Sequence, residues 1–413
     1  MARKGESVWA PVLLHAAAAQ PASVTQASTK PTGRLVLAYH YPWYGYKAPT
    51  NWDEQPTVLA HPLLGPYRSA DPKLIEFQWT LAQEAGIDGF VVSWSGPDTM
   101  PDKILRQMLQ ALDGVSSGFR LCAVQEAWAG KSDLSAAKIK ADLDYLLNQL
   151  TTYRSYLRWN GQPVLFVYTP QGWPAANWRE TFESFAQERG GRFFTVAVAD
   201  GWPFDLDYLS AFDTFGPYAD KYYTREALLK SYGQVAAKVR AAGKPLLFSI
   251  IGGCSHVKKL GFDFERARGQ YIQYRFGLAQ QVQPDWLTVT SWNEWFESMQ
   301  IEPSLECGFD GIKHVRDIAA QFKGKPLRPL DGAALRVWHD RGGALVQLTV
   351  RNIGPHNVYA LTGRHQGKDI LRVAYLLRPG ASEVVKPNTP LDEVVGFLVD
   401  GTTLVGRIEA QAQ

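Results

Sequence analysis

Short apolar runs alternate with longer amphipathic stretches from residue 34 onward. The runs are rich in Val, Leu and Phe and show little polar alternation, which is typical of strands buried on both faces. Such strands belong to parallel sheets that are covered by helices. Eight strands are predicted: Leu35–His40, Gly89–Trp94, Arg120–Gln125, Pro163–Tyr168, Phe193–Val198, Phe212–Gly216, Pro245–Ile250 and Leu287–Trp292.

Most gaps between these runs carry a helical pattern. The predicted helices are Asp71–Ala85, Ser135–Leu150, Thr224–Ala242 and Glu265–Gln281, with a short crossover near Phe204–Ser210. Eight strand–helix repeats over roughly 290 residues predict an α/β fold, the (β/α)8 TIM barrel. The alternative is a doubly wound sheet, which usually has a glycine-rich turn after its first strand. Here that strand runs into Tyr41-Pro-Trp-Tyr-Gly45 instead.

The two ends of the chain differ from this pattern. Residues 1–33 resemble a short secretory signal followed by a disordered lead-in, because Arg3 and Lys4 precede an apolar stretch. Secretion or export to the periplasm is therefore expected, although Glu6 and Pro11 interrupt the stretch. The predicted barrel occupies residues 34–323 and is followed by a linker.

Residues 331–413 show short alternating runs broken by Gly, Pro and Asn, which predict a small C-terminal β-sandwich. This domain either binds carbohydrate or braces the barrel. Bracing is favoured, because Trp338 and Tyr359 are nearly its only candidates for exposed aromatic residues.

Composition narrows the possible partners. The net charge of +3 is small for 413 residues and gives no reason to expect nucleic acid or a membrane as a partner. The three cysteines form no CxxC motif and the eight histidines form no HExxH motif, so no metal or other cofactor is expected. Aromatic residues make up 12% of the chain and suit either sugar binding or an ordinary core. A monomer is expected.

The active site of such a barrel lies at the C-terminal ends of the strands. Acids and aromatic residues gather there, with hardly any basic residues, and this lining suits a neutral polyhydroxylated substrate. The residues at the predicted strand ends are Tyr39–Tyr44, Ser93–Ser95, Gln125–Glu126, Tyr168, Asp200, Tyr218, Ser255–His256 and Asn293–Glu297.

Glu294 and Glu297 follow the eighth predicted strand. Glycoside hydrolysis usually needs two carboxyl groups, one to protonate the leaving oxygen and one to act on the sugar. The two residues are three positions apart in the chain, so their Cα atoms are at most about 10 Å apart. Trp292 and Trp295 would shield the pair from water and raise the pKa of one member. Solvated acids are also common at strand ends, so spacing alone leaves both interpretations open.

Four segments carry a family pattern that spans the predicted barrel. They are Tyr39–Gly45, His61–Tyr67 with Asp71-Pro72, Ala85–Pro97 and, most specific, Thr290–Pro303. Together they resemble glycoside hydrolase family 99, the endo-α-mannosidases and endo-α-mannanases. The resemblance implies a retaining, endo-acting glycosidase. Its carbohydrate partner would be an α-linked, mannan-like polysaccharide or glycan.

The resemblance also implies roles for single residues. Glu294 would act as a base on the sugar 2-hydroxyl, so that the 2-oxygen attacks the anomeric carbon and forms a 1,2-anhydro sugar. Glu297 would be the general acid and then the base that activates water, and Glu126 would lie near the 2-hydroxyl. The other expected substrate-binding residues are Tyr41, Trp43, Trp94, Tyr168, Tyr218, His256, Asn293 and Trp295, although any of the aromatic ones could instead be core residues.

Two departures from the family pattern leave the sugar open. The usual His-Glu-Gly-Thr-Gln-Ile-Glu-Pro reads Phe296-Glu-Ser-Met-Gln-Ile-Glu-Pro303 here, and Ile251–His256 replaces a Pro-Gly-Tyr-Asp-Asp-like loop. A family 99-like enzyme of different specificity, such as an α-glucanase, is therefore an alternative. A hypothesis from another class is a non-hydrolytic barrel that binds glycans or assists polysaccharide assembly. Such a barrel would have no need for an acid pair.

Overall fold

The fold is that of a computed structural model, which describes most of the chain from Gly33 to Glu409. The described residues are 33–45, 52, 60–115, 117–126, 134–199, 205–219, 225–252, 254–256, 262–264, 269–340 and 347–409. The predicted signal segment lies outside these ranges apart from Gly33, and export stays a prediction. None of the helices in these ranges combines the length and hydropathy needed to cross a lipid bilayer.

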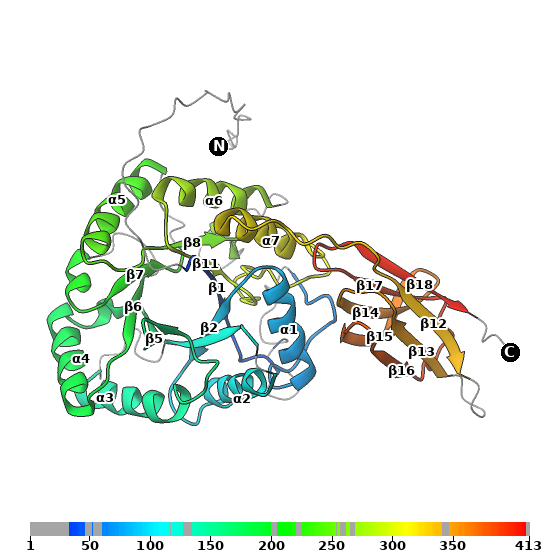
Figure 1. The fold of residues 1–413 in the computed structure, drawn as a ribbon, viewed down its shortest axis with the longest axis horizontal. Helices are drawn as coiled ribbons and strands as arrows, with labels where there is room; N and C mark the ends of the chain where they lie inside the picture. Colours follow the sequence, from blue (N-terminus) through cyan, green and yellow to red (C-terminus); the bar gives the residue numbers. More distant parts are fainter. Residues whose placement is uncertain are drawn as a thin grey trace, which may run out of the picture. The chain divides into compact units, whose positions relative to one another are not determined.

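Eight parallel strands form a nearly closed barrel, which confirms the predicted TIM-like architecture (Figure 1). Neighbouring strands follow the order β7, β6, β5, β3, β2, β1, β11, β8, and the end strands β7 and β8 contact each other. Each strand lies within two residues of a predicted run. The strands are β1 Leu35–His40, β2 Gly89–Trp94, β3 Arg120–Gln125, β5 Gln162–Tyr168, β6 Phe194–Ala199, β7 Thr214–Pro217, β8 Leu247–Ile251 and β11 Trp286–Thr290.

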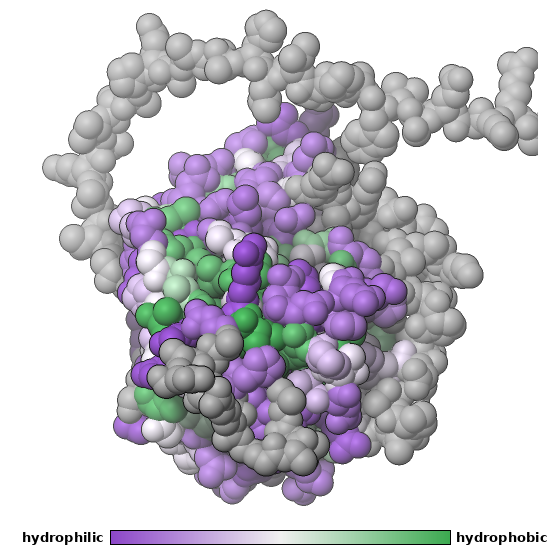
Figure 2. All heavy atoms as spheres, turned by 90° about the vertical axis from the view of Figure 1, so that its right-hand side faces the viewer, coloured by the Kyte–Doolittle hydropathy of each residue, from purple (hydrophilic) through white to green (hydrophobic). Residues whose placement is uncertain are grey.

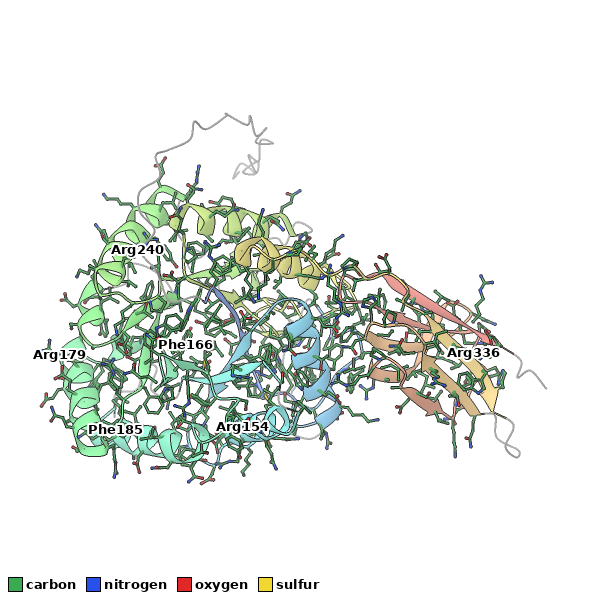
Figure 3. All side chains as sticks on the ribbon, in the orientation of Figure 1. Arg154, Phe166, Arg179, Phe185, Arg240 and Arg336 are labelled. Atoms are coloured by element: carbon green, nitrogen blue, oxygen red, sulfur yellow. The ribbon has the colours of Figure 1, made fainter. Side chains whose placement is uncertain are left out.

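Helices cover the outside of the barrel (Figure 1). They are α1 Pro72–Glu84, α2 Met100–Val115, α3 Ala136–Tyr145, α4 Ala175–Arg189, α5 Arg225–Ala241, α6 Gln270–Val282 and α7 Asp310–Lys323. A π-helical turn, Leu146–Leu150, continues α3, and a 3₁₀ helix, Leu206–Ser210, precedes β7. Figure 3 shows Phe166 inside the ring of strands and Arg179 and Arg240 on the helical side. All residues of β2, β8 and β11 are buried, as expected for strands covered on both faces.

Helix α1 shows how local sequence sets these boundaries. The Asp71 side chain caps its first turn by accepting a hydrogen bond from the backbone N–H of Lys73, and Pro72 supplies a preset φ angle at the first helical position. The chain leaves the helix at Gly86, where φ is +83° and a Cβ atom would lie 2.8 Å from the Ala319 side chain. Glycine is therefore required there by both the backbone angle and the packing.

Seven strands follow the barrel and form one further sheet. They are β12 Leu335–Asp340, β13 Gln347–Asn352, β14 Val358–His365, β15 Lys368–Leu377, β16 Ser382–Val385, β17 Glu393–Phe397 and β18 Thr403–Glu409. Their order is β15, β14, β17, β18, β12, β13, β16, and the end strands β15 and β16 contact each other. The predicted all-β content is confirmed. The strands do not form a clear example of the predicted β-sandwich, because β18 pairs with both β17 and β12 and joins all seven strands into one path.

Three short strands and a 3₁₀ helix, Pro170–Gly172, complete the described elements. β4 (Arg158–Trp159) pairs with β5, and β9 (Cys254–His256) forms an antiparallel pair with β10 (Phe262–Phe264).

Aromatic contacts connect the second sheet to the barrel. The Phe77 ring of α1 lies 6.0 Å from the Tyr359 ring and 5.9 Å from the Tyr375 ring, measured between centroids. Phe309 stacks on Phe397 with 5.1 Å between their centroids. Tyr359 is completely buried, so it serves this contact and not a sugar surface. Hydrophilic residues surround small apolar areas on the side that carries β12, β13 and β16 (Figure 2).

Candidate active site

The segment after β11 turns back on itself and presents two glutamates at the C-terminal end of the barrel. The Ser291 N–H donates to the Met299 carbonyl at 2.9 Å, and the Met299 N–H donates to the Glu294 carbonyl at 3.0 Å. Between them, Ser298 has a φ of +53°, a left-handed conformation that costs a non-glycine residue about 1–2 kcal/mol. This hairpin-like turn places Glu294 and Glu297 on the same short stretch of backbone.

Glu294 is the buried member of the pair, with 5% of its surface exposed. Its backbone N–H donates to the Ser291 hydroxyl at 2.7 Å. Burial raises the pKa of its carboxyl well above the ordinary range, and the neighbouring carboxylates of Glu297 and Glu126 raise it further. Backbone N–H groups of Phe296 and Glu297 donate to this carboxyl and oppose the rise in pKa. Glu294 is therefore held by the backbone in a strongly perturbed environment.

Glu126 follows β3 and joins this acidic group. Burial raises its pKa to about 7, with a further contribution from Glu297, while a hydrogen bond with Ser93 opposes the shift. Both Glu126 and Glu297 are partly exposed. Three carboxyl groups thus lie within mutual electrostatic influence at the barrel mouth, two of them accessible to a ligand. Perturbed carboxyls that gather in this way are characteristic of catalytic sites.

Aromatic side chains at the C-terminal end of β5 and in the segments that follow β1 and β7 adjoin the acids. The Tyr41 hydroxyl donates to the Tyr218 hydroxyl at 2.7 Å, and Glu126, Glu294 and Glu297 all contribute to raising the Tyr41 pKa. The Trp43 ring lies 4.5 Å from the Tyr41 ring, and the Tyr168 ring lies 5.6 Å from the Tyr218 ring. Trp43 and Tyr168 are partly exposed. The structure therefore brings these four predicted substrate-binding residues together beside the acids.

Asn293 is also near the acids, but its amide is used by the protein. It accepts a hydrogen bond from the Tyr41 N–H at 2.7 Å and donates to the Tyr41 carbonyl at 3.0 Å and to the Tyr67 hydroxyl at 3.3 Å. The residue is completely buried. Asn293 was predicted to contact the sugar, but here its amide is occupied by protein groups. It connects the end of β1 to the turn that carries the glutamates.

Two tryptophans that were predicted to bind substrate are likewise buried beneath the exposed part of the site. Trp295 is completely buried, and its indole N–H lies 3.0 Å from the Tyr67 hydroxyl and 3.1 Å from Glu302 Oε2. Trp94 is also completely buried and donates to Asp102 of α2 at 2.8 Å. The structure does not bring either ring to the exposed part of the site. The His256 side chain lies outside the described residues.

Three residues without a predicted role take part in the site. Tyr44 donates through its hydroxyl to the Asn293 carbonyl at 2.7 Å and accepts from the Trp295 N–H at 3.1 Å. Tyr67 donates to Glu302 Oε2 at 2.7 Å. Glu302 is the third of these residues. All three lie inside the segments that carry the family pattern, and this position was the sequence signal that could have pointed to them. Within the described ranges, no three His, Cys, Asp or Glu side chains are arranged to hold a metal ion.

Comparison with known proteins identifies the family. The model of the family described as "Glycosyl hydrolase family 99" matches residues 34–317. The chain belongs to glycosyl hydrolase family 99. The match covers the barrel with Glu126, Glu294 and Glu297 and confirms the resemblance seen in the sequence.

Curated relatives of this family 99 chain are distant. It is 25% identical over 271 residues to a glycoprotein endo-α-1,2-mannosidase-like protein of Danio rerio, with 59% of each chain covered. It is 20% identical over 322 residues to the glycoprotein endo-α-1,2-mannosidase of Rattus norvegicus, covering 67% of this chain and 69% of the relative. The chain thus spans less than two thirds of the Danio rerio protein.

Solved structures share the fold. The family 99 endo-α-mannosidase from Bacteroides thetaiotaomicron aligns with a TM-score of 0.61 and 18% identity, covering 70% of this chain and 97% of that one. A glycoside hydrolase-like protein aligns with a TM-score of 0.53 and 15% identity, covering 73% of this chain and 97% of that one. At these identities the likeness shows the barrel architecture.

Proposed function

We propose that this chain is a glycoside hydrolase that cleaves an α-linked, mannan-like glycan internally and with retention of configuration. One observation carries the proposal: Glu294, Glu297 and Glu126 lie within mutual electrostatic influence at the barrel mouth. Family membership supports it, and the names of the Danio rerio and Rattus norvegicus relatives, which include endo-α-1,2-mannosidase, favour mannose as the sugar.

The two glutamates would divide the chemistry between them. Glu294 takes the proton of the sugar 2-hydroxyl while the 2-oxygen attacks the anomeric carbon, and Glu297 protonates the departing glycosidic oxygen. Glu297 then removes a proton from water, which opens the 1,2-anhydro sugar as Glu294 returns its proton to the 2-oxygen. Two inversions at the anomeric carbon give net retention. Glu126, which lies within electrostatic influence of this pair, would hydrogen-bond the same hydroxyl.

This division requires a defined proton position. The pKa of Glu294 is raised well above the ordinary range by burial and by the carboxylates beside it, which favours the protonated form of this carboxyl. A base must be ionised, so the proton has to leave Glu294 when the substrate binds. The reaction therefore begins from a state in which Glu294 is ionised and Glu297 carries the proton that the leaving oxygen needs.

The aromatic residues would hold the sugar rings. The partly exposed rings of Trp43 and Tyr168 offer apolar faces for C–H contacts, while the hydroxyls of Tyr41 and Tyr218 offer hydrogen bonds. Their contacts with one another fix their orientation before a substrate arrives, which lowers the entropy cost of binding.

A different sugar specificity is the second candidate. Phe296 stands where the family pattern has histidine and is partly exposed, with its ring 5.2 Å from the Tyr44 ring. An apolar ring between the two glutamates removes a polar contact that a histidine would make with the substrate. This observation favours a related α-linked glycan, such as an α-glucan, as the alternative substrate.

Digestion of a panel of α-mannans and α-glucans tests the proposal. The wild-type protein is expected to release oligosaccharides from a mannan, and Glu294→Gln and Glu297→Gln should each lower the rate at least about 10³-fold with the fold intact. Glu306→Gln is the matched control, because Glu306 pairs with His61 on the surface. Release from glucans alone supports the alternative specificity. Binding without any product, or normal cleavage by both variants, refutes the proposal.

A further inference from the structure

A third carboxylate, Glu302, lies at the centre of a buried hydrogen-bond network behind the two glutamates. Only 4% of its surface is exposed. Its Oε2 atom accepts from the Tyr67 hydroxyl at 2.7 Å and from the Trp295 indole at 3.1 Å, and its Oε1 atom accepts from Gln78 Nε2 at 2.7 Å. Burial raises the Glu302 pKa to about 7, and the hydrogen bonds from Gln78, Tyr67 and Trp295 oppose the rise because they favour the ionised carboxylate. A single buried group therefore connects the loop before α1, helix α1 and the turn after β11.

The network extends from Gln78 to the first strand. His40 Nε2 lies 3.0 Å from Gln78 Oε1, and an amide oxygen can only accept, so His40 carries its proton on Nε2. Burial lowers the His40 pKa to about 4, which keeps the ring neutral near pH 7. His40 thus orients the Gln78 amide, and Gln78 in turn donates to Glu302.

Trp295 transmits this arrangement to the reacting groups. It stands between Glu294 and Glu297 in the chain, its N–H lies 3.1 Å from the Tyr44 hydroxyl, and its carbonyl accepts from the Ser298 N–H at 3.1 Å. The Tyr67 hydroxyl also lies 3.0 Å from the Trp295 indole nitrogen. With the side chain and backbone of Trp295 both held, the two glutamates have little freedom to move relative to each other.

We infer that Glu302, acting with Tyr67 through Trp295, is a positioning residue that holds Glu294 and Glu297 at their working separation. Glu302 takes no part in proton transfer to the sugar. The inference rests on the proposed function for its kinetic consequence. Small displacements of reacting groups lower catalysis strongly, on the order of 10²-fold for about 1 Å.

The protein contains a matched control for this network. Asp102 is also buried and accepts from a tyrosine and a tryptophan, through the Tyr145 hydroxyl at 2.6 Å and the Trp94 indole at 2.8 Å. These two contacts join residues of β2, α2 and α3 and include no residue of the turn after β11. Tyr145→Phe therefore removes the same kind of hydrogen bond without disturbing the glutamates.

Steady-state kinetics on the glycan that the wild-type protein cleaves tests the inference. Tyr67→Phe and Glu302→Gln should each lower kcat about 10–100-fold with KM changed less than about 3-fold, whereas Tyr145→Phe should leave kcat within about 2-fold. Equal kcat values for wild type and Tyr67→Phe overturn the inference. So does a loss of kcat that merely follows the unfolded fraction seen in circular dichroism.

Hydrogen exchange separates this inference from the proposed function. The backbone amides of residues 291–303 should exchange several-fold faster in Tyr67→Phe than in wild type and should be unchanged in Tyr145→Phe. Unchanged exchange in Tyr67→Phe overturns the positioning role even for a protein that cleaves no glycan. Faster exchange with an inactive wild type supports the positioning role and refutes only the proposed hydrolysis.

Discussion

The Tyr41 hydroxyl donates a 2.7 Å hydrogen bond to the Tyr218 hydroxyl and so joins the segments that follow β1 and β7 at the barrel mouth. Both residues are nearly buried, with 5% of each surface exposed. Their hydroxyls lie beside the carboxylates of Glu294 and Glu297, which help to raise both tyrosine pKa values above the ordinary range. The two phenols therefore stay neutral. Because the Tyr41 proton is directed at Tyr218, the Tyr218 hydroxyl is the one that can donate toward the acids or a sugar.

A double-mutant cycle measures this contact. Tyr41→Phe and Tyr218→Phe should each lower the free energy of unfolding by about 1 kcal/mol. The double variant should lose less than the sum of the two, with a coupling of about 0.5–1.5 kcal/mol. Urea denaturation followed by fluorescence gives all four values. Strict additivity would show that the hydroxyls do not interact in solution.

The pH dependence of stability tests the raised pKa of Glu126. Its folded-state pKa is about 7, against an ordinary value of 4.5, so protonation favours the folded state. That contribution is complete below about pH 4.5 and is lost as the pH rises through 7. Glu126→Gln should therefore gain stability relative to wild type between these two pH values. Denaturation at pH 4.5, 6 and 8 measures the difference, and a constant difference contradicts the shift.

The left-handed conformation of Ser298 predicts that glycine, the residue of the family pattern at this position, would stabilise the protein. With φ at +53°, a side chain is strained by about 1–2 kcal/mol. Ser298→Gly should raise the free energy of unfolding by about 1 kcal/mol, and the β-branched Ser298→Val should lower it. Chemical denaturation of the two variants decides, and a glycine variant less stable than wild type would show that the serine hydroxyl outweighs the backbone strain.

The contact between the barrel and the second sheet should depend on its apolar part. Phe77→Ala removes a buried ring that contacts Tyr359 and Tyr375 and should cost about 3–5 kcal/mol. Arg378→Ala removes a solvent-exposed ion pair with Glu76 and should cost at most about 1 kcal/mol. Differential scanning calorimetry compares the two. Similar losses for both variants would assign the contact to the ion pair instead.

The strands and the acid pair were predictable because both depend on local sequence. All barrel strands are buried on both faces, so continuous apolar runs indicate them without knowledge of their neighbours. Glu294 and Glu297 are close because only three positions separate them along one turn. The order of the barrel strands then followed from the strand–helix repeat itself.

The side chains that surround the acids are brought together by residues distant in the chain, so local sequence could not predict them. Trp94 and Trp295 lie in the segments predicted to line the site, but their indole N–H groups donate to Asp102 and Glu302. Side-chain packing, which the local sequence does not reveal, determines these orientations. The second sheet forms a single path because β18 pairs with β12, where Val337 lies opposite Ile408, 71 positions further along the chain. Alternation within each strand carries no information on such pairing.

The anomeric configuration of the first product tests the central claim most directly. Proton NMR during cleavage of an α-mannan by the wild-type protein is expected to show the α-anomer first, followed by slow mutarotation, and Glu297→Gln should show no product on the same timescale. A β-anomer that appears first would contradict the retaining mechanism. Cleavage by Glu297→Gln at the wild-type rate would show that Glu297 is not the general acid.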